Sequence, residues 1–271
     1  MTIQEIDEAI DLYGKGESLA QIGRLLGHDS ATIKRNLVKH NITIRTRKEQ
    51  NILSNQARRK KVKDDYFSKI DTPTKAWLLG FIASDGTIRK EVNSIKIGLS
   101  LRDKEILEKI KDELGIEKRI LTYQTSNGFD VCELSWTSKQ QKEDLAKFGI
   151  VNRKTYKALH LPNLSDDLKL AYILGYFDGD GNISISKEHY LRFRLCAYRP
   201  ELLQEMGKFL KKKYNLTYSF SKDPSRNMYE LSISTFYANK LFADMYSLNS
   251  LHLERKYKKY LEYLGHETTT S

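Results

Sequence analysis

One helical phrase occurs twice in this chain, and the repeat limits the fold more than any other feature of the sequence. Residues 76–86 read Ala-Trp-Leu-Leu-Gly-Phe-Ile-Ala-Ser-Asp-Gly, and residues 171–181 read Ala-Tyr-Ile-Leu-Gly-Tyr-Phe-Asp-Gly-Asp-Gly. In each copy small residues recur at every fourth position, which places them on one stripe of an α-helix. The two stripes consist of Ala76, Gly80 and Ser84, and of Ala171, Gly175 and Gly179. Because small side chains let helix backbones approach closely, we expect the two helices to pack through these stripes.

Each phrase ends on Asp-Gly, and the position of the acid is unfavourable. If the stripes pack, Asp85 and Asp180 lie side by side at the paired helix ends. A helix C-terminus carries partial negative charge, and two neighbouring carboxylates repel each other. A shared divalent cation such as Mg²⁺ would resolve the conflict, since carboxylate oxygens are its preferred ligands. We expect Gly86 and Gly181 to close the helices in the left-handed conformation.

Two other interpretations of the repeat are weaker. Buried helices that end in ordinary Asp-Gly turns would explain one copy, but they explain poorly two copies matched in small stripe, aromatic residues and terminal Asp. A transmembrane helix pair is excluded, because the apolar run at 76–83 is far too short to span a bilayer.

The paired phrases resemble the signature of LAGLIDADG homing endonucleases, in the single-chain form that carries both copies. The resemblance implies an α+β fold of two pseudo-symmetric αββαββα halves, packed through the two motif helices. It also implies that Asp85 and Asp180 bind two or three Mg²⁺ ions, for which Mn²⁺ would substitute. The main-chain carbonyls of Ser84 and Gly179 would add ligands. The first copy departs from the family pattern at Ala83, where Asp is common, but that position is not the metal ligand in the family.

Composition agrees with a partner that is a polyanion. The chain has 46 Lys and Arg against 35 Asp and Glu, which gives a net charge of +11. Its two cysteines, Cys132 and Cys196, form neither a disulfide framework nor a zinc-binding spacing. No signal peptide and no membrane-spanning run is found, so we expect a soluble, intracellular protein.

Residues 1–44 predict a separate small helical domain. Helices are expected at 3–13, at 19–26 after a Ser18 cap, and from 31 to about 40 after a cap at Asp29 or Ser30. The segment 19–37 resembles a helix-turn-helix of the resolvase or transposase type, with a small protein-interaction module as the alternative. Its third helix would expose four residues to the DNA major groove: Ser30, Thr32, Lys34 and Arg35.

A basic linker follows at 45–65, and it is expected to be helical in part. Such a run is commonly a solvated tether. Between two DNA-binding units we favour contact with phosphates through Arg45, Arg47, Arg58, Arg59 and Lys60.

The rest of the chain divides into halves at 66–161 and 162–271, with matching element order. In the first half, Thr72 and Pro73 open the motif helix, strands follow at 87–89 and 94–101, and helices at 104–114 and 139–148 flank a hairpin. The hairpin strands, 119–125 and 129–137, turn at Asn127-Gly128, a pair typical of a type I′ turn. In the second half, strands are expected at 182–186, 190–197, 217–221 and 228–235, and helices at 200–213 and 238–247.

The outward strand faces carry side chains suited to DNA. Each alone is commonly a solvated residue, but as a set they suit groove binding, with Arg and Lys reading guanine and Asn or Gln reading adenine. The set comprises Arg89, Lys96, Tyr123, Gln124 and Asn127 in the first half, and Lys187, His189, Arg192, Arg194, Lys222 and Arg226 in the second.

An Arg-Lys pair also stands shortly after the last predicted helix of each half, and it contains Lys154 in one case and Lys256 in the other. Family members use a basic residue near this point to stabilise the charged transition state or to orient water, so both lysines are catalytic candidates, with chance pairing as the alternative. The water-positioning residue is not assigned, because the corresponding positions are near Leu101 and Ala197, which are apolar.

The sequence therefore predicts a site-specific, Mg²⁺-dependent endonuclease that hydrolyses one phosphodiester in each strand of double-stranded DNA. We expect a monomer that acts as a pseudo-dimer. A LAGLIDADG-derived transcription regulator is the first alternative, although such proteins have typically lost the Asp pair. An intron RNA maturase, with intron RNA as a partner, is the second.

Overall fold

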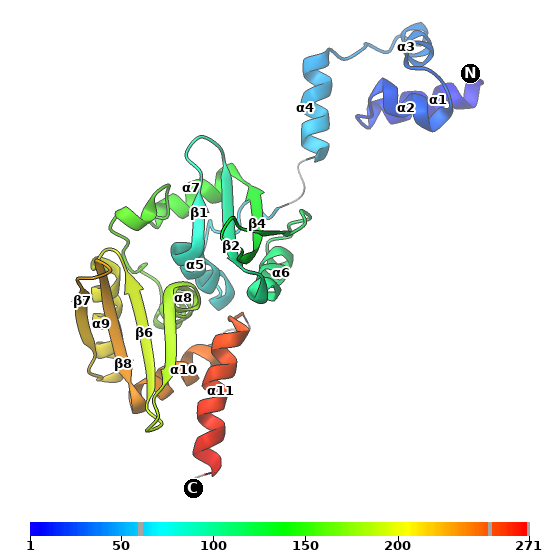
Figure 1. Cartoon of the computed structure of the whole chain (residues 1–271). Helices are drawn as coiled ribbons and strands as arrows, with labels where there is room; N and C mark the ends of the chain where they lie inside the picture. Colours follow the sequence, from blue (N-terminus) through cyan, green and yellow to red (C-terminus); the bar gives the residue numbers. More distant parts are fainter. Residues whose placement is uncertain (59–61, 249–250, 270–271) are drawn as a thin grey trace. The chain divides into compact units, whose positions relative to one another are not determined.

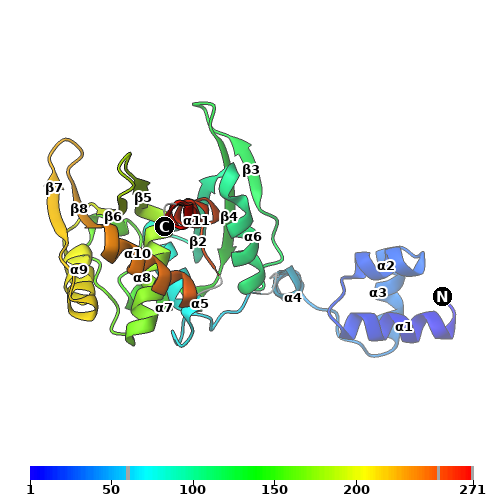
Figure 2. The same ribbon diagram turned by 90° about the horizontal axis from the view of Figure 1, so that it is seen from below.

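The structure is a computed structural model, and it describes residues 1–58, 62–248 and 251–269. The chain divides into two units, residues 1–60 and residues 61–271. Figures 1 and 2 label their helices and strands.

The N-terminal unit is all helical. Helices α1 (Ile3–Gly14), α2 (Leu19–Leu26) and α3 (Ser30–Lys39) enclose a small core of Ala9, Tyr13, Ile22, Ile33 and Leu37. Each helix starts at a side-chain cap, because Thr2, Ser18 and Asp29 accept backbone N–H groups that the first turn leaves unpaired. Of the two candidate caps for α3, the structure selects Asp29. A fourth helix, α4 (Arg47–Arg58), occupies most of the predicted linker.

The C-terminal unit contains two halves of the predicted αββαββα order. The first half consists of α5 (Pro73–Asp85), β1 (Gly86–Ile88), β2 (Ser94–Ser100), the 3₁₀ turn η1 (Leu101–Asp103), α6 (Lys104–Glu113), β3 (Leu121–Gln124), β4 (Asp130–Thr137) and α7 (Lys139–Lys147). The 3₁₀ turn η2 (Lys154–Tyr156) leads to the second half. That half consists of α8 (Asp166–Asp180), β5 (Gly181–Ile185), β6 (Leu191–Ala197), α9 (Glu201–Tyr214), β7 (Ser219–Asp223), β8 (Met228–Ser234) and α10 (Thr235–Leu248).

Each half builds one four-stranded antiparallel sheet, in the order β1-β2-β4-β3 and β5-β6-β8-β7. The two sheets therefore have the same topology. In both views they lie on either side of α5 and α8 (Figures 1 and 2). The strands alternate as predicted, since Ile95 and Ile97 of β2 are fully buried while Lys96 between them is half-buried. The α+β fold class predicted from the sequence is confirmed.

The C-terminal helix α11 (Glu254–Thr269) was not predicted. Its buried residues Tyr260 and Tyr263 belong to the same hydrophobic core as the two halves. The ring of Tyr260 packs against Phe242 of α10, with ring centroids 5.4 Å apart. The segment that closes the chain is therefore part of the second half.

The turn between β3 and β4 is not of type I′. That type needs positive φ at both central residues, whereas here Gly128 has φ +80° and Asn127 does not lie in that region. The Gly128 N–H donates to the Thr125 carbonyl, and the Thr125 N–H donates to the Phe129 carbonyl. The loop is a type I turn closed by a left-handed glycine, as is usual for three-residue hairpin loops.

Candidate active site

The motif helices α5 and α8 cross with their backbones almost in contact. A Cβ added to Gly80 would lie 2.0 Å from the carbonyl oxygen of Tyr172, and one added to Gly175 would lie 1.9 Å from that of Trp77. No side chain larger than hydrogen fits either position. The predicted packing through the small stripes is what the structure shows.

The same crossing brings Asp85 and Asp180 together. A Cβ added to Gly179 would lie 2.9 Å from Oδ2 of Asp85, so the Asp85 carboxylate lies over the backbone directly before Asp180. Burial, together with the charge of Asp180, raises the pKa of Asp85 to about 6. Burial also raises the pKa of Asp180. The two carboxylates thus form a partly desolvated pair of like charges.

The glycines after these acids do not close the helices in the way predicted. Gly86 has φ −69° and ψ 144°, and Gly181 has φ −92° and ψ 164°, so both are extended and begin strands β1 and β5. A Cβ at Gly86 would lie 2.5 Å from the Ile82 carbonyl, and a Cβ at Gly181 equally close to the Phe177 carbonyl. Glycine is required because the chain turns directly from helix to strand, not because φ is positive.

Lys154 and Lys256 are buried at the same helix ends, with exposed fractions of 8% and 2%. The Lys154 ammonium donates to the carbonyl of Ser84, 2.7 Å away. Lys256 reaches the carbonyls of α8 and its C-cap from the first turn of α11. Burial lowers the pKa of both amines, while the nearby carboxylates oppose the shift. Two residues chosen from a sequence pattern therefore lie at matching places in the fold.

The charge of each lysine acts more strongly on the catalytic-site carboxylate of the opposite half than the other lysine does. Lys154, which caps α5, favours the ionised form of Asp180 more than Lys256 does. Lys256, which caps α8, favours the ionised form of Asp85 more than Lys154 does. Each lysine therefore supports the helix of its own half and acts electrostatically on the acid of the other.

Asp178 is the residue whose importance the sequence did not reveal. It is 1% exposed, and its Oδ2 accepts hydrogen bonds from the Trp77 indole at 2.8 Å and from the Leu253 N–H at 3.1 Å. Burial raises the pKa of this carboxyl, and Lys256 opposes the shift. Asp178 thus connects α5, α8 and the start of α11. The sequence signal was the difference between Asp178 and Ala83 at equivalent positions of the two phrases.

The side chains present fit a divalent cation only in part. Among residues 1–58, 62–248 and 251–269, no group of three or more His, Cys, Asp and Glu is placed to hold a metal. The site instead offers two carboxylates that repel each other, which is the donor chemistry Mg²⁺ prefers when substrate phosphates and water complete its coordination. The Ser84 carbonyl, one of the predicted ligands, already accepts the Lys154 ammonium and keeps a second lone pair.

The predicted DNA-contacting residues of the sheets fall into two groups. Some are held by neighbours on the same sheet: Lys96 pairs with Glu133 at 2.8 Å, Arg194 with Glu230 at 3.2 Å and Arg226 with Asp223 at 3.0 Å, while Tyr123 and Gln124 donate to Glu133 and Asp130. Others are exposed: Arg89, Asn127, Lys187, Arg192 and Lys222, the last lying over the Tyr229 ring. His189 stacks on Tyr263 of α11, with ring centroids 4.7 Å apart.

In the N-terminal unit, Ser30, Lys34 and Arg35 of α3 are exposed and Thr32 is half-buried. Arg45 lies over the Tyr13 ring, 3.8 Å from its centre, and donates to the Tyr13 and Glu17 carbonyls. Its side chain therefore fastens the chain to α1, while Arg47 is exposed. The side chain of Arg58 and the whole of Arg59 and Lys60 lie outside the described residues.

The chain belongs to the LAGLIDADG family. The sequence pattern of the LAGLIDADG-like domain matches it twice, at residues 72–148 and at 167–246, which together span more than half of its length. The two matches coincide with the two halves of the C-terminal unit. A comparison with curated proteins found no match to the sequence.

Solved structures with a similar backbone fold include the meganuclease I-SmaMI bound to uncleavable DNA. It is 13% identical, with 70% of this chain and 88% of that chain covered and a TM-score of 0.45. Full-length DUF199/WhiA from Thermatoga maritima is 16% identical. The match covers 71% of this chain and 59% of that chain, with a TM-score of 0.47. Variants of the homing endonuclease I-DmoI are 16% identical. The match covers 66% of this chain and 90% of that chain, with a TM-score of 0.43. These identities are too low to carry residue roles to this chain.

None of the helices in the described part of the chain combines the length and the apolar character needed to cross a membrane.

Proposed function

We propose that this protein is a site-specific, metal-dependent homing endonuclease that hydrolyses one phosphodiester in each strand of double-stranded DNA. The observation that supports this most strongly is the pair Asp85 and Asp180, which are held together at the ends of two helices although burial and the charge of Asp180 raise the cost of ionising Asp85. A structural role does not need two carboxylates at negatively charged helix ends. Membership of the LAGLIDADG family supports the same function.

The carboxylates of Asp85 and Asp180, with the Ser84 and Gly179 carbonyls, would hold Mg²⁺ or Mn²⁺ between the halves. When bound, the metal supplies Lewis-acid stabilisation of the phosphate charge and a water nucleophile at neutral pH. The lysines bind main-chain carbonyls at the helix ends, and among the residues that the structure describes they form no ion pairs with the two acids. In this proposal their charge would also stabilise the negative charge that develops on a phosphate during hydrolysis.

We further propose that the outward faces of the two sheets lie in the DNA groove, on the same surface in each half. The net charge of +11 supports a polyanionic partner. Residues 1–44 would act as a separate DNA-binding helix-turn-helix through α3, and residues 45–65 would follow the phosphates. The halves 66–161 and 162–271 would form one pseudo-dimer in a monomeric chain. Nothing in the structure or the comparisons supports intron RNA as a partner, so the proposal is limited to DNA.

The test measures binding and cleavage together, on a plasmid that carries the genomic sequence in which the gene is inserted. The wild-type protein should linearise the plasmid when Mg²⁺ is added. Asp85→Asn and Asp180→Asn should each abolish double-strand cleavage and retain DNA binding in a gel shift, with nicking as the only residual activity. Asp71→Asn makes the same change beside the opposite end of α5, where the acid pairs with Lys75, and should cleave normally.

Two outcomes would contradict the proposal. Full cleavage by either Asp85→Asn or Asp180→Asn would remove that residue from the mechanism. Specific binding by the wild-type protein without cleavage in Mg²⁺ or Mn²⁺ would identify a DNA-binding regulator instead.

A further inference from the structure

The loop of the β5–β6 hairpin has the same hydrogen bonds as the β3–β4 loop but lacks its glycine. The Ser186 N–H donates to the Tyr190 carbonyl and the His189 N–H donates to the Ser186 carbonyl, as the N–H groups of Thr125 and Gly128 do in the other loop. The left-handed position is occupied by Gly128 in one loop and by His189, with φ +62°, in the other. Because this conformation is strained for a residue with a Cβ, the histidine side chain should make contacts that offset the strain.

The His189 side chain lies against α11. Its ring stacks on the ring of Tyr263, with centroids 4.7 Å and planes 12° apart. Its Nε2 lies 3.2 Å from the main-chain carbonyl oxygen of Tyr263, and since a carbonyl only accepts, Nε2 is the donor. Tyr263 is buried and His189 is half-buried, whereas Lys187 and Glu188 beside it are exposed. His189 therefore faces the protein, while the loop residues before it face solvent.

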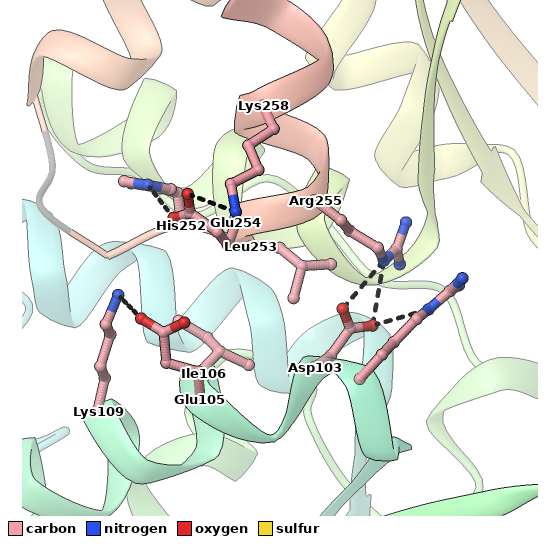
Figure 3. A pocket seen from close by; sticks show the side chains of 10 residues that line it. Asp103, Glu105, Ile106, Lys109, His252, Leu253, Glu254, Arg255 and Lys258 are labelled. Carbon is pink, nitrogen blue, oxygen red and sulfur yellow. Dashed lines mark hydrogen bonds and ion pairs between the residues drawn. The ribbon is translucent and has the colours of Figure 1, made fainter.

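Helix α11 is itself held by contacts that do not involve this hairpin. In its first turn, Nε of Arg255 pairs with Asp103 of the first half at 3.1 and 3.2 Å, and Figure 3 shows the two side chains facing each other. Further along, the Tyr260 hydroxyl donates to the Asn239 side chain of α10 at 2.9 Å. The helix also lies against β5 (Figure 2). The β5–β6 hairpin thus rests on a helix whose position both halves determine.

A different helix supports the corresponding hairpin of the first half. The β1–β2 loop is held by Lys142 of α7, whose Nζ donates to the carbonyls of Lys90 and Val92 at 3.0 and 3.1 Å. Each hairpin carries exposed cations suited to DNA, such as Arg89 in the first half and Lys187 in the second. The two hairpins are therefore held by unrelated contacts, which separate substitutions can remove.

We propose that His189 is a positioning residue for target recognition: by fixing the β5–β6 hairpin to α11, it sets the sequence discrimination of the half-site that the second half binds. This inference rests on the proposed binding of DNA by the sheets. A hairpin held in one place presents Lys187 and Arg192 in one geometry, so a wrong base pair leaves their donors unpaired. A hairpin that is free to move adapts to several base pairs. Lys142 has the same role for the other half-site.

The experiment measures binding, on the sequence in which the gene is inserted and on duplexes in which each base pair of that sequence is changed in turn. His189→Gly removes the ring and suits the left-handed backbone, so the variant should fold. Where a changed base pair weakens wild-type binding about 10-fold or more, His189→Gly should reduce that factor to about threefold, on one side of the site's centre only. Lys142→Met should do the same on the other side. Tyr263→Phe keeps the stacked ring and should discriminate like the wild type.

Unchanged discrimination by His189→Gly would overturn the inference, and so would an equal loss on both sides of the site. If the loop needed only a left-handed residue, His189→Gly would raise the melting temperature and leave discrimination intact. Specific binding by a wild-type protein that does not cut would refute the endonuclease function and support this inference if the variants behave as described. Wild-type binding without sequence discrimination would refute both.

Discussion

Replacing Asp85 by Asn should make the metal-free protein more stable, although it destroys the proposed catalytic site. Burial and the neighbouring Asp180 raise the pKa of Asp85 from 3.8 to about 6. The folded protein therefore binds this proton more tightly than the unfolded chain does. Stability is unaffected by this group below pH about 4, falls as the pH rises towards 6, and stays reduced above it.

The size of the effect follows from the two pKa values. At about 1.4 kcal/mol for each pH unit between them, ionising Asp85 at pH 7.5 costs at most about 3 kcal/mol of folding free energy. Asn keeps the shape and carries no charge. For a folded unit of this size, 1 kcal/mol corresponds to about 2–4 °C, so we expect the melting temperature to rise by about 12 °C at most.

The assay is thermal unfolding in EDTA at several pH values, and again with Mg²⁺. The melting temperature of the variant should be higher than that of the wild type at pH 7.5 and about equal to it near pH 4. Mg²⁺ should raise the wild-type melting temperature and change that of the variant less, since one anionic ligand is removed. Asp144→Asn is the matched control: although burial opposes it, hydrogen bonds from Lys147, Ser68 and Gln140 lower the pKa of Asp144, so this variant should melt lower. An Asp85→Asn variant that is no more stable than the wild type at pH 7.5 would refute the reasoning.

Three further outcomes are expected. Gly80→Ala should destabilise the protein by about 3 kcal/mol or more in denaturant unfolding, because its Cβ would lie 2.0 Å from the Tyr172 carbonyl oxygen. Gly98→Ala is the control: nothing lies within 4 Å of its Cβ, so its stability should change by less than about 1 kcal/mol. A chain shortened to begin at Val62 should still fold and cleave, and its affinity should depend less on salt, by about 0.9 in the slope of log K against log salt for every phosphate that it no longer neutralises. In the full-length chain, Lys34→Ala with Arg35→Ala should shorten the DNase footprint on one flank only, and an unchanged footprint would contradict a DNA-binding role for α3.

The start of the shortened chain is chosen from hydrogen bonds that the sequence could not show. The Lys63 N–H donates to the Leu114 carbonyl, and the Lys63 carbonyl accepts the Gln141 amide. A start at residue 66, directly after the predicted linker, would remove both bonds. The boundary between a tether and a folded unit depends on such distant partners.

Much of the fold follows from local patterns. The small stripes, the caps at Ser18 and Thr72 and the alternation in β2 are each set by residues within a turn or a strand of one another, so periodicity and capping rules apply directly. The duplication supplied the long-range part, because two copies of one unit imply two similar halves. Helix α11 was not predicted because its position depends on tertiary contacts of Tyr260 and Tyr263. It also lies outside the duplicated order of elements, so the repeat did not indicate it.

The site could be predicted only to the level of residue identity. The spacing of the phrases indicated Asp85 and Asp180, and an Arg-Lys pattern indicated Lys154 and Lys256. No pattern states that one ammonium meets three carbonyls and the other meets one. That difference arises from Asp178 and Asp103, which hold the start of α11 from two halves of the molecule.

The lysines also explain how the protein keeps two carboxylates available at one place. Buried acids commonly gain stability from direct ion pairs with nearby cations. Here both ammonium groups bond to main-chain carbonyls, and in the described part of the chain neither forms an ion pair with Asp85 or Asp180. The cations therefore offset the partial negative charge of the helix ends while leaving the carboxylate oxygens to another ligand. An arrangement in which the acids were paired directly would be more stable and less able to bind a metal.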